Sequence, residues 1–315
     1  MTPSIAGRSV MVRVPATSAN LGPGFDTLGL ALAIYDELII TGTDAPGVFV
    51  EVTGVGRGDV PTDESNLVAR SIAHTFRHVG LPSPGLQLQA NNVIPHGGGL
   101  GSSAAAIVSG VMAAAGLLRG VAELTLDTML VLATELEGHP DNVAPALYGG
   151  LTIAWTTDAG PRAKKLLVHR GVSPLVFVPD HSVSTALARS LQPAVVPYAD
   201  AVFNLSRSAL LVAALTQSPE LLLEATEDRL HQEYRASAMP ETSSLVHLLR
   251  EQGFAAVVSG AGPSILVLAS DPSQRAAAAA LVAGHAGDTW RAVMAAVDVK
   301  GATVNPHQVE AKPQL

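Results

Sequence analysis

The feature that most restricts the fold of this chain is an alternation between short β-type runs and longer helical runs along all 315 residues. Several short runs, such as "LQLQA" at 86–90, are polar at every second position. Strands with one polar face suit an antiparallel or mixed sheet covered on one side, whereas all-parallel strands are almost continuously apolar. The pattern therefore predicts an α+β fold. Strands are expected at 9–14, 35–41, 48–54, 86–90, 150–155, 175–179, 255–260, 264–269 and 290–297, and helices at 64–79, 102–118, 125–137, 198–216, 218–230, 242–252 and 272–285.

A polar, turn-rich segment, "TTDAGPRAKK" at 156–165, separates two groups of expected strands. Turn residues clustered between periodic segments are typical of a connection between structural units. We therefore expect two lobes, an N-terminal domain at residues 1–160 and a C-terminal domain at residues 161–315.

Composition restricts the partners of the chain. With 48% hydrophobic and 15% charged residues the chain is a folded globular protein, and its net charge of −8 argues against nucleic acid. The absence of cysteine excludes disulfides and thiolate metal sites and is compatible with a reducing cytoplasm. The N-terminus lacks the basic and apolar regions of an export signal, and the longest uncharged stretch, between His96 and Arg119, is mostly Ala, Gly and Ser. We expect a cytoplasmic protein that binds neither nucleic acid nor a membrane.

The stretch "NNVIPHGGGLGSSAAAIVSG" at 91–110 places four glycines directly before an expected helix, with Ser at the favoured N-cap. The first turn of a helix has unpaired N–H groups and partial positive charge, so a glycine loop there can bring donors against a phosphate. A plain helix-capping turn is the alternative. The stretch does not fit the Walker A loop, because no Lys follows Gly101, and it lacks the spacing of the esterase elbow and of the dinucleotide fingerprint.

Three segments resemble the signature motifs of the GHMP kinases, the superfamily named for galactokinase, homoserine kinase, mevalonate kinase and phosphomevalonate kinase. "PHGGGLGSSAA" at 95–105 is similar to the phosphate loop, "VRVPATSANLGPGFDTLGLAL" at 12–32 to the N-terminal motif and "VVSGAGPSILVLA" at 257–269 to the C-terminal glycine motif. "SANLGPGFDTLGLAL" and "EGHPDNVAPALYGG" at 137–150 look specifically like the homoserine kinases. The resemblance implies a two-lobed GHMP kinase fold, with an N-terminal mixed or antiparallel sheet with helices and a C-terminal ferredoxin-like α/β sandwich.

The same resemblance implies ATP-dependent phosphorylation of L-homoserine to O-phospho-L-homoserine, with Mg²⁺, on the route to threonine. Phosphoryl transfer mainly needs a cradle for the phosphates, a metal and a hydroxyl held in line. The residues that the resemblance assigns to the nucleotide are Asn66, Pro95, His96, Gly97, Gly98, Gly99, Leu100, Gly101, Ser102, Ser103, Ala104 and Ala105.

A hard cation such as Mg²⁺ prefers oxygen ligands, usually one or two carboxylates with phosphates and water. By resemblance the protein ligands are a serine hydroxyl, Ser103 or Ser102, and a glutamate before the "HPDN" segment. Glu137 stands in the matching "EGHPDN" string and is the favoured ligand. Glu135 remains open, because the family varies in length at this point.

Homoserine carries an ammonium, a carboxylate and a reactive hydroxyl, so its site should hold an acid, cations and neutral hydrogen-bonding groups. Local chemistry alone would explain Asn20 and Asp26 as an Asx-type turn and the arginines as solvated surface residues. The resemblance instead makes them substrate contacts, with Asp26 on the ammonium and the arginines on the carboxylate. The full set implied for the substrate is Asn20, Asp26, Asn142, Thr185, Arg189, Arg235 and Gly262.

Two mechanisms remain open at the "DN" pair. Asp141 is the candidate for a base that removes the hydroxyl proton, and Asn142 is the candidate substrate ligand in an enzyme without a dedicated base. A loose transition state needs no strong base, so both are compatible with the chemistry.

Competing functions also remain: another GHMP kinase acting on mevalonate or a sugar, or a descendant that binds a ligand without transferring phosphate. The histidines lack the H-E-x-x-H spacing, so zinc is not expected. His96 departs from the small residues typical of that loop position, and His139 belongs to the "GHPDN" string. The sequence leaves a homodimer open.

Overall fold

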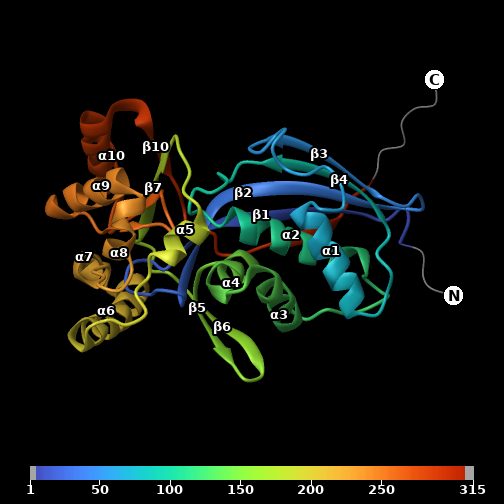
Figure 1. The fold of residues 1–315 in the computed structure, drawn as a ribbon, viewed down its shortest axis with the longest axis horizontal. Coiled ribbons are helices and arrows are strands. Elements are labelled where there is room, and N and C mark those ends of the chain that lie inside the picture. The colour runs from blue at the N-terminus through green and yellow to red at the C-terminus, as the bar shows by residue number, and fades with distance from the viewer. Residues whose placement is uncertain (1–4, 309–315) are drawn as a thin grey trace.

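A computed structural model describes residues 5–308 and places the chain in two lobes, each built on its own sheet (Figure 1). Both described ends of the chain lie at the far side of the first lobe, away from the second. The α+β, two-lobed fold expected from the pattern of runs is confirmed.

The first sheet has the strand order β11-β1-β2-β4-β3, and β5 adds to β2 and forms a hairpin with β6. β3 runs parallel to β4, and the other pairs are antiparallel, so the sheet is mixed. The strands are β1 (Ser9–Ala19), β2 (Leu28–Thr43), β3 (Val48–Gly54), β4 (Gly85–Asn92), β5 (Leu151–Thr157), β6 (Gly160–Leu166) and β11 (Thr303–Pro306).

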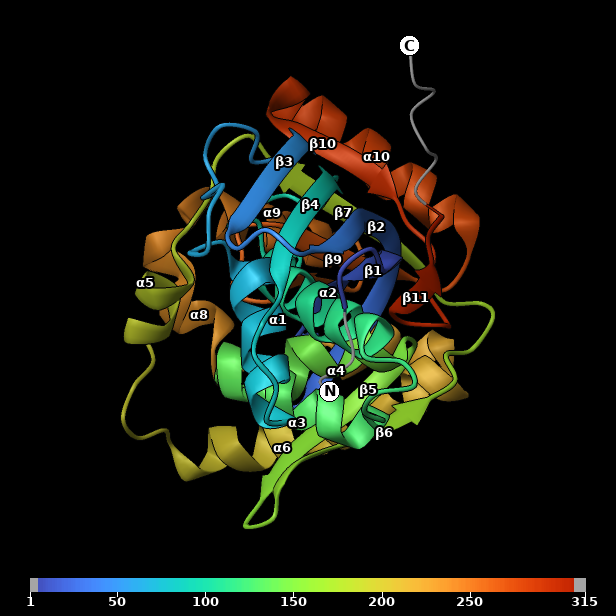
Figure 2. The same ribbon diagram turned by 90° about the vertical axis from the view of Figure 1, so that its right-hand side faces the viewer.

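One face of this sheet is covered by helices α1 (Leu67–His78), α2 (Ser102–Leu117), α3 (Leu126–Glu137) and α4 (Pro140–Tyr148) (Figure 2). β4 shows the reason, because Leu86, Leu88 and Ala90 are buried while the residues between them are exposed. The Ala-rich α2 is buried on most of its surface and packs against β1, α1 and α3. It is the central helix of the lobe, and its N-terminus faces the second lobe.

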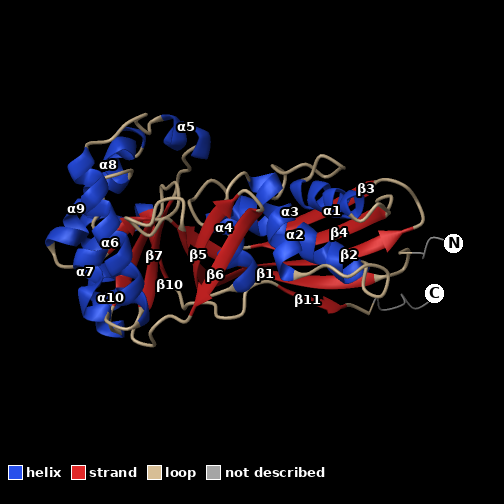
Figure 3. Cartoon of the chain, turned by 90° about the horizontal axis from the view of Figure 1, so that it is seen from below, coloured by secondary structure: helices blue, strands red, loops and turns tan. Residues whose placement is uncertain are grey.

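The second sheet is antiparallel, with the order β10-β7-β9-β8. In chain order its strands stand fourth, first, third and second, with helices in both crossovers, which is the ferredoxin-like arrangement. Its helices lie mainly on the side away from the first lobe (Figure 3). The elements are β7 (Ser173–Pro179), α5 (Thr185–Ser190), α6 (Tyr198–Thr216), α7 (Leu222–Ala225), α8 (Gln232–Arg235), α9 (Pro240–Glu251), β8 (Ala256–Val258), β9 (Ile265–Ala269), α10 (Pro272–Ala286) and β10 (Trp290–Met294), with short 3₁₀ turns at Pro219–Leu221, Ala236–Ala238 and Gly287–Thr289.

Strands β7, β8 and β9 of the second sheet are buried on both faces, whereas β10 is largely exposed. In β7, Leu175 and Phe177 pack into a core with α9 and α10, whereas Val176 and Val178 face a core that continues into the first lobe. This explains why β8 and β9 are continuously apolar in sequence, unlike the amphipathic strands of the first sheet. One hydrophobic core therefore extends across both lobes, and a second lies within the second lobe.

Two strands of the first sheet, β6 and β11, come from beyond residue 160. The first sheet is therefore completed by segments on both sides of the boundary expected at 160. The division into domains at 1–160 and 161–315 stays a prediction.

Several expected elements differ from the structure. The helix expected at 218–230 is wrong beyond α7, because the Asp228 carboxylate accepts hydrogen bonds from the N–H groups of Leu230, His231 and Gln232 and turns the chain. Helix α4 was not expected because of its two prolines. Pro140 occupies the first helical position, where no N–H partner is needed, and Pro145 lies inside the helix. The short α5, β6 and β11 were also not expected from the periodicity.

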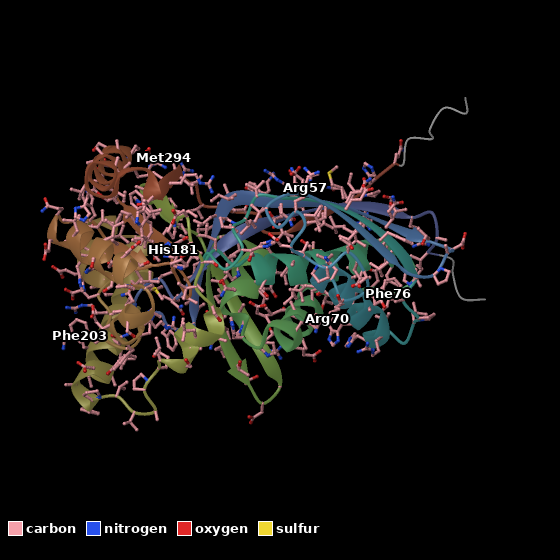
Figure 4. The ribbon with its side chains drawn as sticks, turned by 45° about the horizontal axis from the view of Figure 1, so that its top comes forward. Arg57, Arg70, Phe76, His181, Phe203 and Met294 are labelled. Atoms are coloured by element: carbon pink, nitrogen blue, oxygen red, sulfur yellow. The ribbon has the colours of Figure 1, made fainter. Side chains whose placement is uncertain are left out.

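Among the described residues, α6 is the one helix that is long and apolar enough, by length and composition, to cross a membrane. Its Leu211, Ala214 and Leu215 are fully buried in the core that spans both lobes, and polar contacts add to this packing. Asn204 Nδ2 donates to Asp228 at 2.8 Å and Arg207 pairs with Glu227 at 2.8 Å. Phe203, at the end of the molecule in Figure 4, carries the guanidinium groups of Arg207 and Arg229 on its ring.

Candidate active site

The three glycine-containing motifs meet at the N-terminus of α2. Residues 95–101 lead from β4 into this helix, and the turn at 259–264 lies against them from the second lobe. The segment between β7 and α5 approaches from another side; Figure 4 shows His181 of this segment where the two lobes meet. Segments far apart in the sequence therefore converge on one short loop.

Four successive carbonyl groups of this loop are bonded to surrounding protein. Those of residues 97 and 98 accept from the backbone N–H groups of Val183 and Ser264, both at 3.3 Å. Those of residues 99 and 100 accept from Ser259 Oγ at 2.7 Å and from the N–H of Thr17 at 3.0 Å. Among residues 5–308, no group accepts a hydrogen bond from the backbone N–H of residues 97–104. The loop thus offers a row of free donors at a helix N-terminus, which is an anion-binding arrangement.

Glycine is required at two positions of the loop for steric reasons. A Cβ on Gly99 would lie 2.2 Å from the Ser259 carbonyl oxygen, and one on Gly101 would lie 2.0 Å from Thr17 Oγ1. Both residues also have positive φ, of +75° and +70°. Gly101, not a serine, is the N-cap of α2, so the expectation of a serine N-cap is corrected: without a capping side chain the helix end stays open to a ligand.

The other loop residues divide between core and surface. The side chains of Leu100, Ala104 and Ala105 are buried in the core, so that only their backbone could reach a ligand. Ser102 and Ser103 line a cavity of about 230 Å³ that continues from the loop between α1, α2 and the strands β2, β3 and β4. Its walls are mostly aliphatic, with Leu38, Val50, Val52, Val60, Val68, Leu88, Ala90 and Ala106 among the lining residues. An apolar cavity beside a row of amide donors matches the two ends of a nucleotide.

Polar groups are few in this cavity. Asn66 caps α1, accepting from the N–H of Val68 at 3.0 Å and donating to the Pro61 carbonyl at 2.8 Å, so the residue lines the cavity and anchors the loop before the helix. Asp36 accepts from the N–H groups of Val93 and Ile94, and burial raises the pKa of its carboxyl against these bonds. Ser109 Oγ is buried without a hydrogen-bond partner among the described residues.

His96 is exposed but also lines the cavity. Its ring lies against Gly56, where an added Cβ would meet the imidazole at 2.4 Å. The side chain therefore turns towards the loop that follows β3.

The structure separates the two candidate metal ligands. Glu137, the last residue of α3, accepts from Ser103 Oγ at 2.7 Å, whereas Glu135 pairs with His74 of α1 at 2.8 Å. Burial raises the pKa of Glu137, and the hydrogen bond from Ser103 opposes the rise. A half-buried carboxylate in contact with a hydroxyl beside the phosphate loop is a donor set that fits Mg²⁺.

Asp141 and Asn142 lie in the first turn of α4, close to Glu137. Asp141 is almost fully buried, and its Oδ1 is 2.5 Å from His139 Nδ1. Burial alone would lower the pKa of His139, but the Asp141 carboxylate raises it above the ordinary value. Asn142 is half-buried, and its Oδ1 accepts from Thr17 Oγ1 at 2.9 Å.

Opposite α4, the N-terminal motif brings Asn20 and Asp26 together. Asn20 Oδ1 accepts from the N–H of Asp26 at 2.9 Å, and its Nδ2 donates to the Gly260 carbonyl at 2.8 Å. Asp26 in turn forms an ion pair with Arg189 of α5, with 3.1 Å between Oδ1 and Nη2. Two residues that are 163 positions apart in the sequence thus form one ion pair.

Arg235 is buried beside this pair, only 2% exposed. Its Nη1 lies 3.5 Å from the Gly260 carbonyl, and its guanidinium stands 5.0 Å from the centre of the Phe25 ring. With the Gln192 amide turned so that both of its ends have partners, Gln192 Oε1 accepts from Arg235 Nε at 2.8 Å. Burial and the neighbouring Arg189 lower the pKa of Arg235. Two guanidinium groups near each other, one buried, form a cationic pocket suited to a carboxylate.

Two further residues expected at the substrate complete this side. The N–H of Gly262 donates to the Ser259 carbonyl at 2.8 Å and closes the glycine turn, while the Gly262 carbonyl lies against Gly99. Thr185 begins α5, and its side chain lies outside the described part of the structure.

Sequence reasoning did not identify the residues that hold the motifs together. Thr17 and Ser259 stand inside the motifs that resemble the GHMP kinases, but their bonds to the phosphate loop cross 83 and 160 positions of the chain and have no local signal. Phe25, against which Arg235 and His231 pack, was also missed. Its place directly before Asp26 in the N-terminal motif was the available hint.

Comparisons with known proteins agree with this geometry. The GHMP kinases N terminal domain family matches residues 66–150, and the GHMP kinases C terminal family matches residues 209–285. The homoserine kinase of Clavibacter michiganensis subsp. michiganensis is 71% identical over 298 residues, covering 95% of this chain and 94% of the relative. That of Leifsonia xyli subsp. xyli is 70% identical over 303 residues, covering 96% of this chain and 94% of the relative.

Solved structures give the same result. The crystal structure of homoserine kinase from Cytophaga hutchinsonii matches with a TM-score of 0.82 at 29% identity, covering 95% of this chain and 98% of that chain. L. major mevalonate kinase matches with a TM-score of 0.69 at 17% identity, over 96% of this chain and 100% of that chain, which shows a shared fold.

The fold and the loop at the N-terminus of α2 are those of a small-molecule kinase, and the chain belongs to the GHMP kinases. Within that class it is a member of the homoserine kinase family, and it is therefore an ATP-using enzyme.

Proposed function

We propose that this enzyme transfers the γ-phosphoryl group of ATP to the side-chain hydroxyl of L-homoserine, giving O-phospho-L-homoserine and ADP in threonine biosynthesis. The observation that carries the proposal is that two unlike binding features lie near the first turn of α4. One is the row of free N–H groups of residues 97–104, and the other is the cluster of Asp26, Arg189 and Arg235. The first suits a polyphosphate and the second a zwitterionic amino acid.

The nucleotide would bind with its phosphates on the loop and its base in the apolar cavity. Residues 97–104 supply the donors, and their fixed carbonyls keep those donors directed at the ligand without reorganisation. Asn66 would stand beside the base and His96 at the cavity mouth, with Pro95 at the start of the loop. We assign nucleotide binding to this whole segment.

Ser103 and Glu137 would hold Mg²⁺, and the separate pairing of Glu135 with His74 favours Glu137 as the carboxylate ligand. When bound, the cation would neutralise charge on the β- and γ-phosphates. Before binding, the Ser103 hydroxyl bonds to the Glu137 carboxylate and keeps both oxygens on the phosphate side of α3.

The amino acid would replace the ion pair between Asp26 and Arg189 with two of its own. Its ammonium would bind Asp26, with Asn20 holding the loop, and its carboxylate would bind Arg189 and the buried Arg235. Thr185 and Gly262 are assigned to the same pocket. A mevalonate or a sugar has no ammonium to occupy Asp26, so the paired charges favour an amino acid.

In the reaction the homoserine hydroxyl oxygen bonds to the γ-phosphorus while the bond to the β–γ bridging oxygen breaks. The hydroxyl proton leaves to the transferred phosphoryl group or to solvent, since a loose transition state needs little prior proton removal. Asn142 would contact the hydroxyl. Asp141 is the alternative acceptor of the proton, but its carboxylate already shares a short hydrogen bond with His139. A cytoplasmic location and a homodimer remain predictions.

The proposal is tested by measuring ADP release with homoserine, serine, threonine, mevalonate and galactose as acceptors, and by identifying the product by ³¹P NMR. We expect turnover with homoserine, dependence on Mg²⁺ and a phosphomonoester product. Faster turnover with mevalonate or galactose would reassign the substrate. No turnover with any acceptor, together with measurable ADP binding, would indicate a ligand-binding descendant of the family.

A further inference from the structure

Thr17 lies near the end of β1, fully buried between the phosphate loop and the start of α4. It makes one backbone and one side-chain hydrogen bond, and each goes to a different part of the active site. Its N–H donates to the Leu100 carbonyl at 3.0 Å, and its Oγ1 donates to Asn142 Oδ1 at 2.9 Å. Thr17 therefore connects the loop assigned to the phosphates with the residue assigned to the acceptor hydroxyl.

The packing around Thr17 leaves little freedom for this connection. A Cβ on Gly101 would be 2.0 Å from Thr17 Oγ1 and 3.2 Å from Asn142 Oδ1. The absence of a side chain at Gly101 is what allows the hydroxyl, the amide oxygen and the helix N-cap to lie together. A shift of Thr17 would move both the loop and the amide.

The hydrogen bond also favours one orientation of the Asn142 amide. The Thr17 hydroxyl can donate or accept, and among the described residues the Asn142 oxygen is the acceptor for its proton. With the amide reversed, this buried hydroxyl proton would lose its acceptor. Within residues 5–308 no group accepts from Asn142 Nδ2, and the residue is half-buried. The NH₂ group is thus the end of the amide left for a ligand.

We propose that Thr17 is a positioning residue that orients Asn142 so that its NH₂ group, not its carbonyl, faces the reacting oxygens. This inference rests on the proposed function. The NH₂ group then donates to one lone pair of the homoserine hydroxyl oxygen and leaves the other for the γ-phosphorus. Because the backbone N–H of the same residue holds Leu100, the distance between the phosphate loop and the acceptor hydroxyl is set through one buried residue. An Asn142 held in this way acts as a donor and does not remove the proton.

The central test compares Thr17→Val with Thr17→Ser in steady-state kinetics of the full-length enzyme. Valine keeps the shape but loses the hydroxyl, whereas serine keeps the hydroxyl. We expect Thr17→Val to lower kcat about tenfold, the scale of one lost hydrogen bond, with the affinity for ADP changed less than about twofold. Thr17→Ser should stay within about threefold of the wild type.

A matched control removes a buried hydroxyl elsewhere. Thr75 in α1 is also fully buried, and its Oγ1 donates to the Ser71 carbonyl at 2.9 Å. Thr75→Val should lower the melting temperature as Thr17→Val does but leave kcat unchanged. Equal kcat values for Thr17→Val and the wild type would overturn the proposal.

The pairwise coupling is measured by adding Asn142→Ala. If Thr17 acts through Asn142, Thr17→Val should have little further effect on kcat in the Asn142→Ala enzyme. An undiminished effect of Thr17→Val in that background would show that Thr17 does not work through the amide.

Asn142→Asp decides the orientation independently, even where Thr17→Val does not fold. Aspartate can still accept from Thr17 but has lost the donor, so its kcat should fall at least as far as that of Asn142→Ala. An Asn142→Asp enzyme that retains most of its activity would contradict the proposed orientation.

The wild-type enzyme distinguishes this inference from the proposed function. A wild type that does not phosphorylate homoserine would refute the proposed function. A wild type that does so, together with a Thr17→Val enzyme of unchanged kcat, would refute only the role of Thr17.

Discussion

The two halves of the candidate site are built from different parts of the polypeptide. The nucleotide half is made mainly of backbone: a row of N–H groups in one continuous segment, residues 97–104, with an aliphatic cavity behind it. The amino-acid half is made of side chains. Asp26, Arg189 and Arg235 come from three distant segments and reach their place only because the two lobes pack together.

This difference affects how each half tolerates change. A backbone cradle depends on close approach and on φ angles, so it is sensitive to any added atom. A cluster of ion pairs depends on charge and hydrogen-bond geometry, so conservative size changes are tolerated better than loss of a guanidinium. The following predictions separate the two cases.

The largest effect is expected from Gly99→Ala. Its Cβ would meet the Ser259 carbonyl oxygen at 2.2 Å, and the loop would have to move. We expect activity to fall about 1000-fold through misplaced phosphate donors, the upper range for loss of a preorganised donor. Gly120→Ala is the matched control, because Gly120 has the same φ of +75° with nothing within 4 Å. Initial rates and melting temperatures of both variants measure the difference; equal losses would mean that strain in φ, and not the close approach, matters.

Arg235→Ala should damage the other half selectively. Loss of a buried, charge-assisted contact to the substrate carboxylate should lower kcat/KM for homoserine about 100-fold, while ADP binding measured by calorimetry stays nearly unchanged. Arg250 is the control, since it is also largely buried in the second lobe but bonds to the carbonyls of Leu223 and Ala256. Arg250→Ala should lower the melting temperature without changing KM for homoserine. Equal damage by Arg235→Ala to both ligands would mean that its guanidinium is structural.

Glu137→Gln and Glu135→Gln test which glutamate binds Mg²⁺ between the nucleotide half and the amino-acid half of the site. Glu137 contacts Ser103, whereas Glu135 contacts His74. We expect Glu137→Gln to raise the Mg²⁺ concentration needed for half-maximal rate about 30-fold, and Glu135→Gln to change it less than about twofold. A magnesium titration of the rate at saturating ATP measures both. The reverse order would move the metal site to Glu135.

The smallest effect concerns stability and pH in the amino-acid half. His231 is fully buried, stacks on Phe25 and bonds to the Gly22 carbonyl at 2.8 Å. Burial lowers its pKa below 6.5, with Arg235 acting in the same direction and the carboxylates of Asp228 and Asp26 opposing. As the pH falls, His231 takes up a proton in the unfolded chain before it does so in the folded chain. The contribution of His231 to the free energy of unfolding is therefore complete above pH 6.5 and decreases as the pH falls below that value.

Urea unfolding at pH 7.5 and pH 5.5 measures this dependence. The wild type should have a lower free energy of unfolding at pH 5.5. His231→Gln should be less stable at pH 7.5 but should show a smaller difference between the two pH values. An unchanged difference would assign the pH dependence to other groups.

The sequence predicted the nucleotide half better than the amino-acid half. The glycine loop and the helix after it follow from local patterns, and the helix expected at 102–118 lies at Ser102–Leu117. The amphipathic strands of the first sheet also follow from local patterns, although β1 and β2 extend well beyond the expected 9–14 and 35–41. Helix α4 and the turn after α7 did not follow, because prolines and the bonds to Asp228 override periodicity. The roles of Asn20, Asp26, Arg189 and Arg235 came only from the resemblance to a family.

A glycine-rich segment before an alanine-rich helix is enough, in the primary structure alone, to predict a turn that leads into a helix N-terminus, because both features arise from the conformational limits of neighbouring residues. That this helix end has no capping side chain and stays open to a ligand was shown only by the structure. The direction of those donors was set by the folded chain, since the loop carbonyls are held by Thr17, by Val183 and by Ser259 and Ser264 of one turn, from three separate segments. The pairing of Asp26 with Arg189 and the different partners of Glu135 and Glu137 were likewise set by packing. Hydrogen bonds and ion pairs act over about 3 Å, so which distant groups come within that range depends on the assembled core and not on local sequence.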